Sequence, residues 1–320
     1  MRILLVVDGS PYSEMAIKLL KALQLSPQTE VMVMTVVPEH TFLGGITLNM
    51  LRGAGGAKER TLKAQEQKAA ELLQKPVKTL RASGLEVESL VCWGRPAEEI
   101  IKRARTMGAE LVVIGAKGVD DPERFPLGSV AQKVMKYTDT SVLLVREKTT
   151  DIRRVLLATD GSKHSEVTAR FLLDLPLPLK SQVFLVTALQ SHIAALVKMP
   201  TLDLETNQKL LEELQEKEES AARSLMAKTK KQFQEKGYEV SSMVLRGEPA
   251  EEILMASETF TPELIALGAK GLTGIEAFLL GSVAQRVARF SRYSVLIVRQ
   301  RERQPWRQEL VELGSGNRQQ

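Results

Sequence analysis

The sequence predicts an α/β protein made of two tandem domains, each with a mostly parallel β-sheet. Short runs rich in Val, Ile and Leu alternate with longer amphipathic segments, which is typical of βαβ units with helices on both faces of a sheet. The whole pattern occurs twice, because landmarks of the first half return about 153 residues later. A repeat of this length indicates a duplicated domain rather than a solenoid, whose units run roughly 20–50 residues.

Two segments show the duplication most clearly. Gly94-Arg-Pro-Ala-Glu-Glu-Ile100 returns as Gly247-Glu-Pro-Ala-Glu-Glu-Ile253, and Leu127-Gly-Ser-Val-Ala-Gln132 returns unchanged as Leu280-Gly-Ser-Val-Ala-Gln285. Two domains also fit the usual length of about 100–200 residues each. We therefore expect one domain over residues 1–148, a second over 149–299, and a disordered tail over 300–320.

The elements of the first half follow from its apolar patterning. Pro76 is expected to kink or split the second helix, and the glycine-rich residues 39–57 are expected to form a mobile loop. In the second half, residues 204–236 predict one long amphipathic helix that covers the sheet. Strands are expected at Ile3–Val7, Glu30–Val36, Glu86–Val91, Leu111–Ile114 and Val142–Val145, and helices near Ser13–Leu25, Lys58–Ala82, Ala97–Met107 and Ser129–Tyr137.

Composition excludes several classes of protein. Hydrophobic residues make up 43% and charged residues 26% of the chain, which is ordinary for a globular protein. No apolar stretch approaches the roughly 20 residues that span a bilayer, and a strand follows Met1-Arg2 directly, so neither a membrane span nor a signal peptide is expected. The single cysteine, Cys92, excludes an internal disulfide and fits a reducing compartment. We therefore expect a cytoplasmic protein.

The net charge of +5 does not indicate a nucleic-acid partner. Basic and acidic residues are interleaved, and aromatic residues make up only 4% of the chain. Nucleic-acid binding proteins instead carry basic stripes, often with stacking aromatic residues. The three histidines, His40, His164 and His192, share no metal-ligand spacing. We assign no nucleic acid and no metal-ligating residues.

The most informative motif is G-x2-G-x9-G-S, present once in each half. It occurs as Gly115-Ala-Lys-Gly118 followed by Gly128-Ser129, and again as Gly268-Ala-Lys-Gly271 followed by Gly281-Ser282. Glycines let a backbone approach a phosphate closely, and the Gly-Ser pair opens a helical pattern whose N-terminus attracts an anion. The pattern predicts a nucleotide phosphate site in each half. The structural alternative is that these glycines only allow tight packing of strand against helix.

An acidic residue ends the first strand of each half, at Asp8 and Asp160. Ligands of open α/β sheets bind outside the carboxyl ends of strands where the strand order reverses. If the first and fourth strands are neighbours, each carboxylate faces the glycine loop across one crevice. Asp8-Gly9-Ser10 is alternatively a helix N-cap turn alone.

On these motifs the chain resembles a tandem universal stress protein of the ATP-binding branch, over residues 1 to about 299. The resemblance implies Rossmann-like five-stranded sheets of order 3-2-1-4-5 that associate through their last strands, within one chain as a pseudo-dimer or between chains as a homodimer. It implies ATP as ligand, Mg²⁺ held through the phosphates, and a stress-response regulator read through its conformation or dimerisation by an unknown protein partner. The implied nucleotide-binding residues are Asp8, Val36, Gly115, Lys117, Gly118, Gly128, Ser129 and Val130, then Asp160, Ala188, Gly268, Lys270, Gly271, Gly281, Ser282 and Val283.

The two sites are not expected to be equal. The first half carries Val119-Asp-Asp-Pro-Glu-Arg-Phe-Pro-Leu127 between its glycine pairs, with three acidic residues beside the phosphate site. Asp120 or Asp121 could hold the cation, but repulsion of phosphate is the simpler expectation. We therefore expect tighter ATP binding in the second domain.

Two other classes of function remain open. A slow ATPase or adenylyl-transferring enzyme is disfavoured because no H-x-G-H, K-M-S-K-S or S-G-G-x-D-S motif is present and no base is placed to activate water. We assign no catalytic residues. A nucleotide-free interaction module is the third class, in which the duplication serves only to pair the two domains.

Overall fold

The computed structural model describes residues 1–38, 55–119, 121, 126–146, 151–178, 180–189, 204–271 and 280–300. The side chains of residues 55–59, 61 and 204–211 are outside this description. Most of the predicted loop at 39–57 and nearly all of the predicted tail therefore lie outside the described residues. The last three residues of that predicted loop, 55–57, belong instead to a helix.

The described elements repeat one βαβ series in the two halves of the chain. The first half contains β1 (Arg2–Val6), α1 (Pro11–Ala22), β2 (Glu30–Val37), α2 (Gly55–Arg81), β3 (Glu86–Trp93), α3 (Pro96–Thr106), β4 (Leu111–Gly115), α4 (Ser129–Tyr137) and β5 (Ser141–Val145). The second half contains β6 (Arg154–Ala158), α5 (Lys163–Asp174), β7 (Gln182–Leu189), α7 (Leu204–Glu235), β8 (Glu239–Arg246), α8 (Pro249–Phe260), β9 (Leu264–Gly268), α9 (Ser282–Phe290) and β10 (Ser294–Val298).

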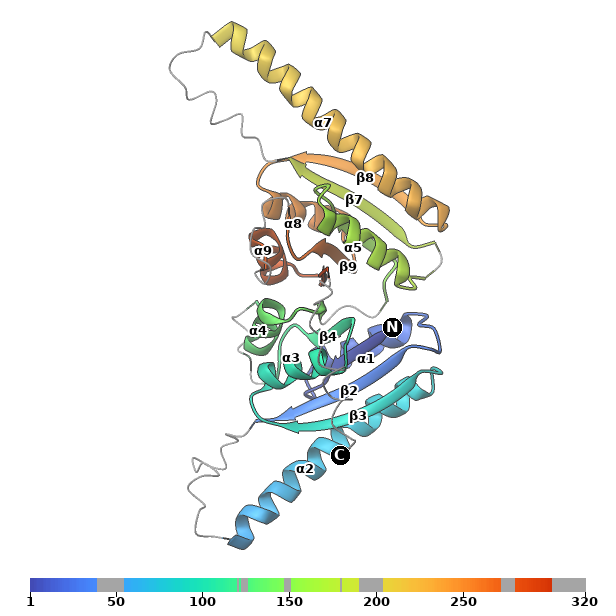
Figure 1. Ribbon diagram of the computed structural model, residues 1–320, viewed down its shortest axis with the longest axis vertical. Helices are drawn as coiled ribbons and strands as arrows, with labels where there is room; N and C mark the ends of the chain where they lie inside the picture. The colour runs from blue at the N-terminus through green and yellow to red at the C-terminus, as the bar shows by residue number, and fades with distance from the viewer. Residues whose placement is uncertain are drawn as a thin grey trace, which may run out of the picture.

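All these strands form one ten-stranded sheet of order β3-β2-β1-β4-β5-β10-β9-β6-β7-β8. The predicted order 3-2-1-4-5 is confirmed in the first half, and the second half repeats it in mirror order. Neighbouring strands within each half are parallel, and the two halves meet through one antiparallel pair, β5 with β10. Leu143 lies opposite Leu296 at the centre of that pair. Figure 1 shows the two halves end to end, with α2 and α7 at opposite ends of the molecule.

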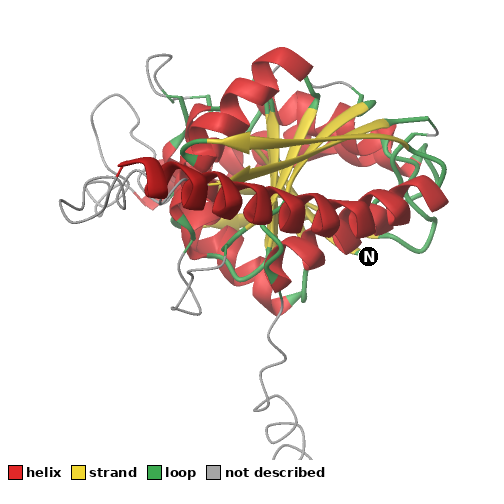
Figure 2. Ribbon diagram, turned by 90° about the horizontal axis from the view of Figure 1, so that it is seen from above, coloured by secondary structure: helices red, strands yellow, loops and turns green. Residues whose placement is uncertain are grey.

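Helices cover both faces of the sheet, as predicted (Figure 2). One apolar layer gathers buried residues of α1, α2, α5 and α7, such as Leu19 and Phe233. The other gathers buried residues of α3, α4, α8 and α9, such as Ile100 and Val287. Each layer contains residues of both halves, so the halves share their hydrophobic core.

The long helices bear on two expectations from the sequence. Pro76 was expected to kink or split its helix; the split is wrong, because α2 runs unbroken from Gly55 to Arg81 with Pro76 inside it. Leu73 and Leu80 lie on either side of Pro76 and are buried in the core, which holds the helix together across the missing hydrogen bond. The helix predicted at 204–236 is confirmed as α7, and it covers the sheet through Met226 and Phe233.

Candidate functional site

The first and fourth strands of each half are neighbours, which places the acidic residue against the glycine loop. Strand β1 pairs with β4, and β6 pairs with β9, both in parallel. A Cβ atom placed on Gly118 would lie 2.9 Å from Oδ2 of Asp8. The same construction on Gly271 gives 2.7 Å to Oδ2 of Asp160. The acidic residue therefore lies against the glycine loop in both halves, as expected from the sequence.

The turn after each first strand fixes the direction of that carboxylate. Gly161 has φ = +76°, a left-handed conformation that favours glycine. Oδ1 of Asp160 accepts a hydrogen bond of 3.0 Å from the Ser162 amide, and Ser162 Oγ accepts one of 3.2 Å from the Ser165 amide. Ser162 thus caps α5 while the second carboxylate oxygen of Asp160 faces the glycine loop.

The first half repeats this turn. Gly9 has φ = +81°, Asp8 Oδ1 accepts from the Ser10 amide at 3.0 Å, and Ser10 Oγ accepts from the Ser13 amide at 3.1 Å. The N-cap interpretation of Asp8-Gly9-Ser10 is therefore confirmed for Ser10. This capping turn is compatible with a role of Asp8 beside the glycine loop, because Asp8 uses Oδ1 in the turn while its Oδ2 atom faces Gly118.

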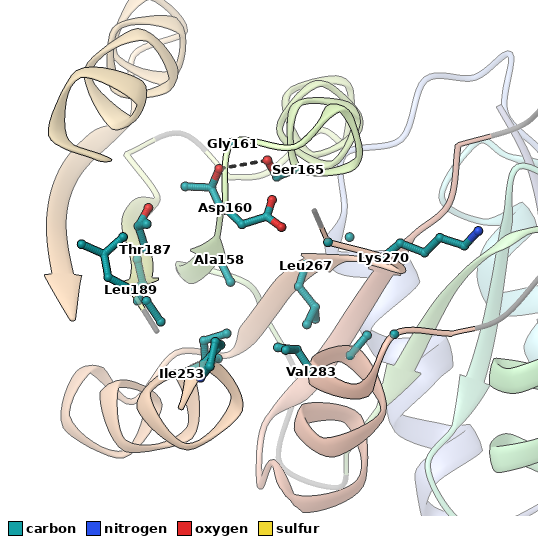
Figure 3. Close-up of a pocket in the computed structure, with 18 of the residues that line it drawn as sticks. Ala158, Asp160, Gly161, Ser165, Thr187, Leu189, Ile253, Leu267, Lys270 and Val283 are labelled. Carbon is teal, nitrogen blue, oxygen red and sulfur yellow. Dashed lines mark hydrogen bonds between the residues drawn. The ribbon is translucent and has the colours of Figure 1, made fainter. Parts of the chain in front are cut away.

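A cavity of about 1070 Å³ lies at the carboxyl ends of β6, β7 and β9 in the second half. In Figure 3, Thr187 and Leu189 lie at one side of this cavity, Asp160 lies between them and the glycine loop, and Lys270 extends on the opposite side. All eight residues that the sequence singled out in the second half line this one cavity: Asp160, Ala188, Gly268, Lys270, Gly271, Gly281, Ser282 and Val283.

The N-terminus of α9 forms one wall of the cavity. No side chain caps α9 within the described part of the chain, and Ser282 and Val283 in its first turn line the cavity. Their amides and the helix dipole offer a positive end to an anion. The Gly281 amide donates instead to the carbonyl oxygen of Ala269 at 2.8 Å. A phosphate would therefore use the amides after Gly281 rather than that of Gly281 itself.

The first glycine of each motif serves packing. A Cβ atom on Gly115 would lie 2.7 Å from Cβ of Tyr12, at the start of α1. The equivalent atom on Gly268 would lie 3.2 Å from Cβ of His164. The structural alternative thus holds for Gly115, where close contact of strand and helix requires the glycine. Gly268 serves packing as well, although it also lines the cavity.

In the first half, an acidic side chain occupies the glycine loop. The Gly118 amide donates to Asp121 Oδ2 at 2.7 Å, and the Ser129 amide donates to Asp121 Oδ1 at 3.2 Å. A Cβ atom on Gly128 would collide with the same carboxylate. The sequence identified Asp121 as an acidic neighbour of this loop but not as its hydrogen-bonding partner.

The remaining residues predicted for the first half lie around this loop. The carbonyl oxygen of Lys117 accepts a hydrogen bond of 3.3 Å from Ser10 Oγ. Val36, in β2, and Val130, in the first turn of α4, are half-buried against the core layer that contains Ile100. The first-half set is thus assembled at the same place in the fold as the second-half set.

Two helices contribute cavity residues that the motifs did not predict. Ala222 and Leu225 of α7 and Ile253 of α8 line the cavity in the second half. Leu225 packs against the turn that follows Asp160. A Cβ atom placed on Gly161, in that turn, would lie 2.8 Å from Cδ2 of Leu225. The amphipathic pattern of residues 204–236 predicted a buried face for α7. It could not predict that this face would close a ligand cavity.

An ion-pair network ties α7 to the edge strand beside the cavity. Arg246, the last residue of β8, donates from Nη2 to Glu219 Oε2 at 2.8 Å, and Arg223 donates to Glu219 Oε1 at 2.5 Å. Hydrogen bonds from these two arginines hold the pKa of the half-buried Glu219 carboxyl below its usual range. The neighbouring residue on α7, Glu218, lines the cavity.

The described residues contain neither of two other kinds of feature, a membrane-spanning helix and a metal-binding cluster. None of the helices placed by the structure combines the length and apolar character of a membrane span. Within the same described ranges, no three His, Cys, Asp or Glu side chains gather in a way that could hold a metal ion.

A doubly wound sheet with an acidic turn, a glycine loop and a cavity at the point of strand-order reversal defines an α/β protein with a candidate ligand site at its switch point. The model of the Universal stress protein family matches residues 1–146 and 151–299, so the chain belongs to this family as a tandem member.

Individual relatives agree with this assignment. Universal stress protein MJ0577 of Methanocaldococcus jannaschii is 29% identical over 46% of this chain and 95% of its own length. A universal stress protein of Mycolicibacterium smegmatis is 27% identical over 78% of this chain and 82% of its own length. The crystal structure of a universal stress protein from Archaeoglobus fulgidus has a TM-score of 0.61 at 19% identity, covering 95% of this chain and 97% of that one. That structural likeness supports the fold.

Proposed function

We propose that this protein is a cytoplasmic stress-response regulator that binds ATP in its second half. ATP binding would change the conformation or the dimerisation of the protein, and a protein partner would recognise that change. One observation carries the proposal. The eight residues of the second half that the sequence assigned to a nucleotide site all line one cavity at the switch point of the sheet.

The size and chemistry of the cavity suit a nucleotide. Its volume of about 1070 Å³ is at the upper end of small-molecule sites, which span about 300–1,000 Å³. Apolar side chains such as Leu189, Leu225 and Ile253 line it alongside Ala188, and these suit the adenine base. The Asp160 carboxylate lies between that side and the glycine loop, where it can accept hydrogen bonds from a ribose (Figure 3).

The opposite side of the cavity suits the phosphates. Gly271 leaves room for close approach, and the uncapped start of α9 supplies amides and a favourable dipole. Lys270 extends on this side (Figure 3). Mg²⁺ prefers oxygen ligands and keeps several of its waters, so it would be held through the phosphate oxygens while Lys270 and the helix N-terminus balance the remaining charge.

A pair of matched variants of the full chain tests the proposal. Wild type titrated with ATP and Mg²⁺ in a calorimeter is expected to bind one equivalent. Asp160→Ala should weaken that binding at least tenfold, because the ribose loses its acceptor. Asp8→Ala is the matched control, since it removes the same kind of turn hydrogen bond from the first half. Its ATP affinity should stay within about twofold of wild type.

The outcomes separate the three classes of function. Loss of binding in Asp160→Ala alone supports the nucleotide site in the second half. A wild-type chain that binds no ATP would favour the nucleotide-free interaction module. Phosphate release from ATP that is faster in wild type than in Asp160→Ala would favour the enzyme.

A further inference from the structure

The carboxylate of Asp121 sits at the anion-binding position of the first half. We propose that Asp121 acts as a built-in substitute for a phosphate group and thereby closes the first half to nucleotide phosphates, leaving the second half as the ATP site. This inference rests on the proposed function, because it assumes that the equivalent position in the second half receives a phosphate.

The hydrogen bonds of Asp121 are those that a phosphate would make. The Gly118 amide belongs to the second glycine of the motif, and the Ser129 amide opens α4. They donate to the two different oxygens of one carboxylate, at 2.7 and 3.2 Å. Hydrogen bonds to an ionised acceptor are about twice as strong as neutral ones. Asp121 therefore satisfies the loop and the helix N-terminus together, as two oxygens of one phosphate would.

The surroundings fit closely around that carboxylate. A Cβ atom on Gly118 would lie 2.9 Å from Asp8 Oδ2 and 3.3 Å from Asp121 Oδ2, so both carboxylates lie close to this glycine. Gly128 is buried, whereas its counterpart Gly281 is half-buried. A phosphate entering here would meet a space that Asp121 already fills and a negative charge that the second half lacks at the equivalent position, because Asp8 has a counterpart in Asp160 but Asp121 has none.

The tether gives Asp121 a further advantage over a free anion. It lies three residues from Gly118 and eight from Ser129, so it competes as part of the same short loop. A group on a short tether acts at an effective concentration on the order of millimolar. ATP would have to displace the Asp121 carboxylate from the two amides. The displaced carboxylate would then still repel the phosphates, because it remains nearby on the same loop.

The second half provides the internal comparison. Its motif is the same G-x2-G-x9-G-S, but Gly274 occupies the sequence position equivalent to Asp121. Gly271 and Ser282, the counterparts of the two donors, line the large cavity. Of the differences between the two loops, Asp121 is the one that accepts hydrogen bonds from these two amides, which makes its role testable by one substitution.

The test follows the amide signals of the full chain by NMR during titration with ATP and Mg²⁺. In wild type, the signals of Gly271 and Ser282 should move and those of Gly118 and Ser129 should not. In Asp121→Ala, both pairs should move, and the calorimetric stoichiometry should rise from one to two. Before any ligand is added, the Gly118 and Ser129 amide protons of this variant should also shift upfield, because they have lost an acceptor.

A charge-matched control separates occupation of the site from general repulsion. Asp120→Asn removes one negative charge from the adjacent sequence position and should leave Gly118 and Ser129 unresponsive to ATP. Three results would overturn the inference: Gly118 and Ser129 respond in wild type, fail to respond in Asp121→Ala, or respond equally in Asp120→Asn.

The proposed function can fail separately. If Gly271 and Ser282 do not respond to ATP in wild type, the second-half site is wrong, whatever happens in the first half. Inorganic triphosphate then serves as the probe of the Gly118 and Ser129 amides, in wild type, Asp121→Ala and Asp120→Asn and with the same criteria. Asp121→Asn is a second variant for the case that alanine disturbs the loop. Its neutral side chain should give an intermediate response.

Discussion

The guanidinium of Arg146, directly after β5, donates a hydrogen bond of 2.8 Å to the carbonyl oxygen of Ala288 in α9 of the other half. Arg299, directly after β10, returns the same contact to Met135 in α4, also at 2.8 Å. Burial lowers the pKa of both guanidinium groups. The backbone amide of Arg146 also donates to Ser294 Oγ at 2.9 Å. The two halves are thus tied by reciprocal hydrogen bonds on either side of the β5–β10 pair.

The Arg146→Ala substitution is expected to destabilise the full chain by about 1–3 kcal/mol, because buried carbonyl oxygens of Ala288 and Pro126 lose their donor. Urea unfolding measures the loss. The control is Arg95→Ala, whose side chain is 73% exposed and pairs only with Glu98 among the contacts described. It should change the free energy of unfolding by no more than about 0.5 kcal/mol. Equal losses in the two variants would contradict the cross-link.

Gly115→Ala should destabilise the protein more than Gly268→Ala. The added methyl group would lie 2.7 Å from Cβ of Tyr12 in the first case, whereas its nearest neighbour in the second is the Lys270 carbonyl oxygen at 3.1 Å. Overpacking of this kind costs about 1–3 kcal/mol. Thermal unfolding of both full-length variants gives the comparison, and a larger loss in Gly268→Ala would count against the packing role of Gly115.

Phe233→Ala should cost about 3–5 kcal/mol, because this side chain is fully buried in the face of α7 that covers the sheet. Phe290→Ala is the matched control, since Phe290 is 54% exposed and should lose less than about 1 kcal/mol. Urea unfolding measures both. Similar losses would mean that α7 is not held by this contact.

The Cys92 thiol should react slowly with a disulfide reagent, and the pH at which its labelling rate reaches half of the maximum should be raised. Burial, followed by the charge of Glu99, raises its pKa above the usual range of a thiol. A disulfide reagent should therefore label the folded chain more slowly than the urea-unfolded chain at pH 8, with the rate rising at higher pH. Glu99→Gln should lower that midpoint, and an unchanged midpoint would remove Glu99 as a cause.

The same shift has a defined effect on stability. Because the folded state favours the protonated thiol, the contribution of Cys92 is complete below the unfolded pKa. It is lost as the pH rises through the higher, folded pKa. Cys92→Ser should flatten this alkaline part of the stability profile.

The sequence predicted most of the fold because the strands and helices are locally encoded. The helix at Ser129–Tyr137 has the expected bounds, since Gly128 precedes it and the extended Thr138 ends it. Helix α1 ends at Ala22 rather than at Leu25, because Leu23 is already extended. The expected split at Pro76 is wrong for the opposite reason. Packing of Leu73 and Leu80 outweighs a local preference that the sequence shows plainly.

The candidate site was predictable as far as its motifs reach. The glycine motif, the acidic residue after the first strand and the family resemblance together pointed to eight residues that line one cavity in the second half. The contribution of α7 depends on how a distant helix packs over β7 and β8, and no motif encodes that. Nor could the sequence show that Asp121 turns inward to the Gly118 and Ser129 amides rather than outward to solvent.

The antiparallel pairing of β5 with β10 joins two similar halves inside one polypeptide. In an assembly of two identical chains, an aspartate at position 121 would appear in both subunits and would alter both sites at once. Covalent linkage removes that constraint, because each half mutates by itself while its partner is always present at a fixed ratio. The molecule is in this sense a permanent heterodimer, in which the site of one half can change while that of the other half stays as it is.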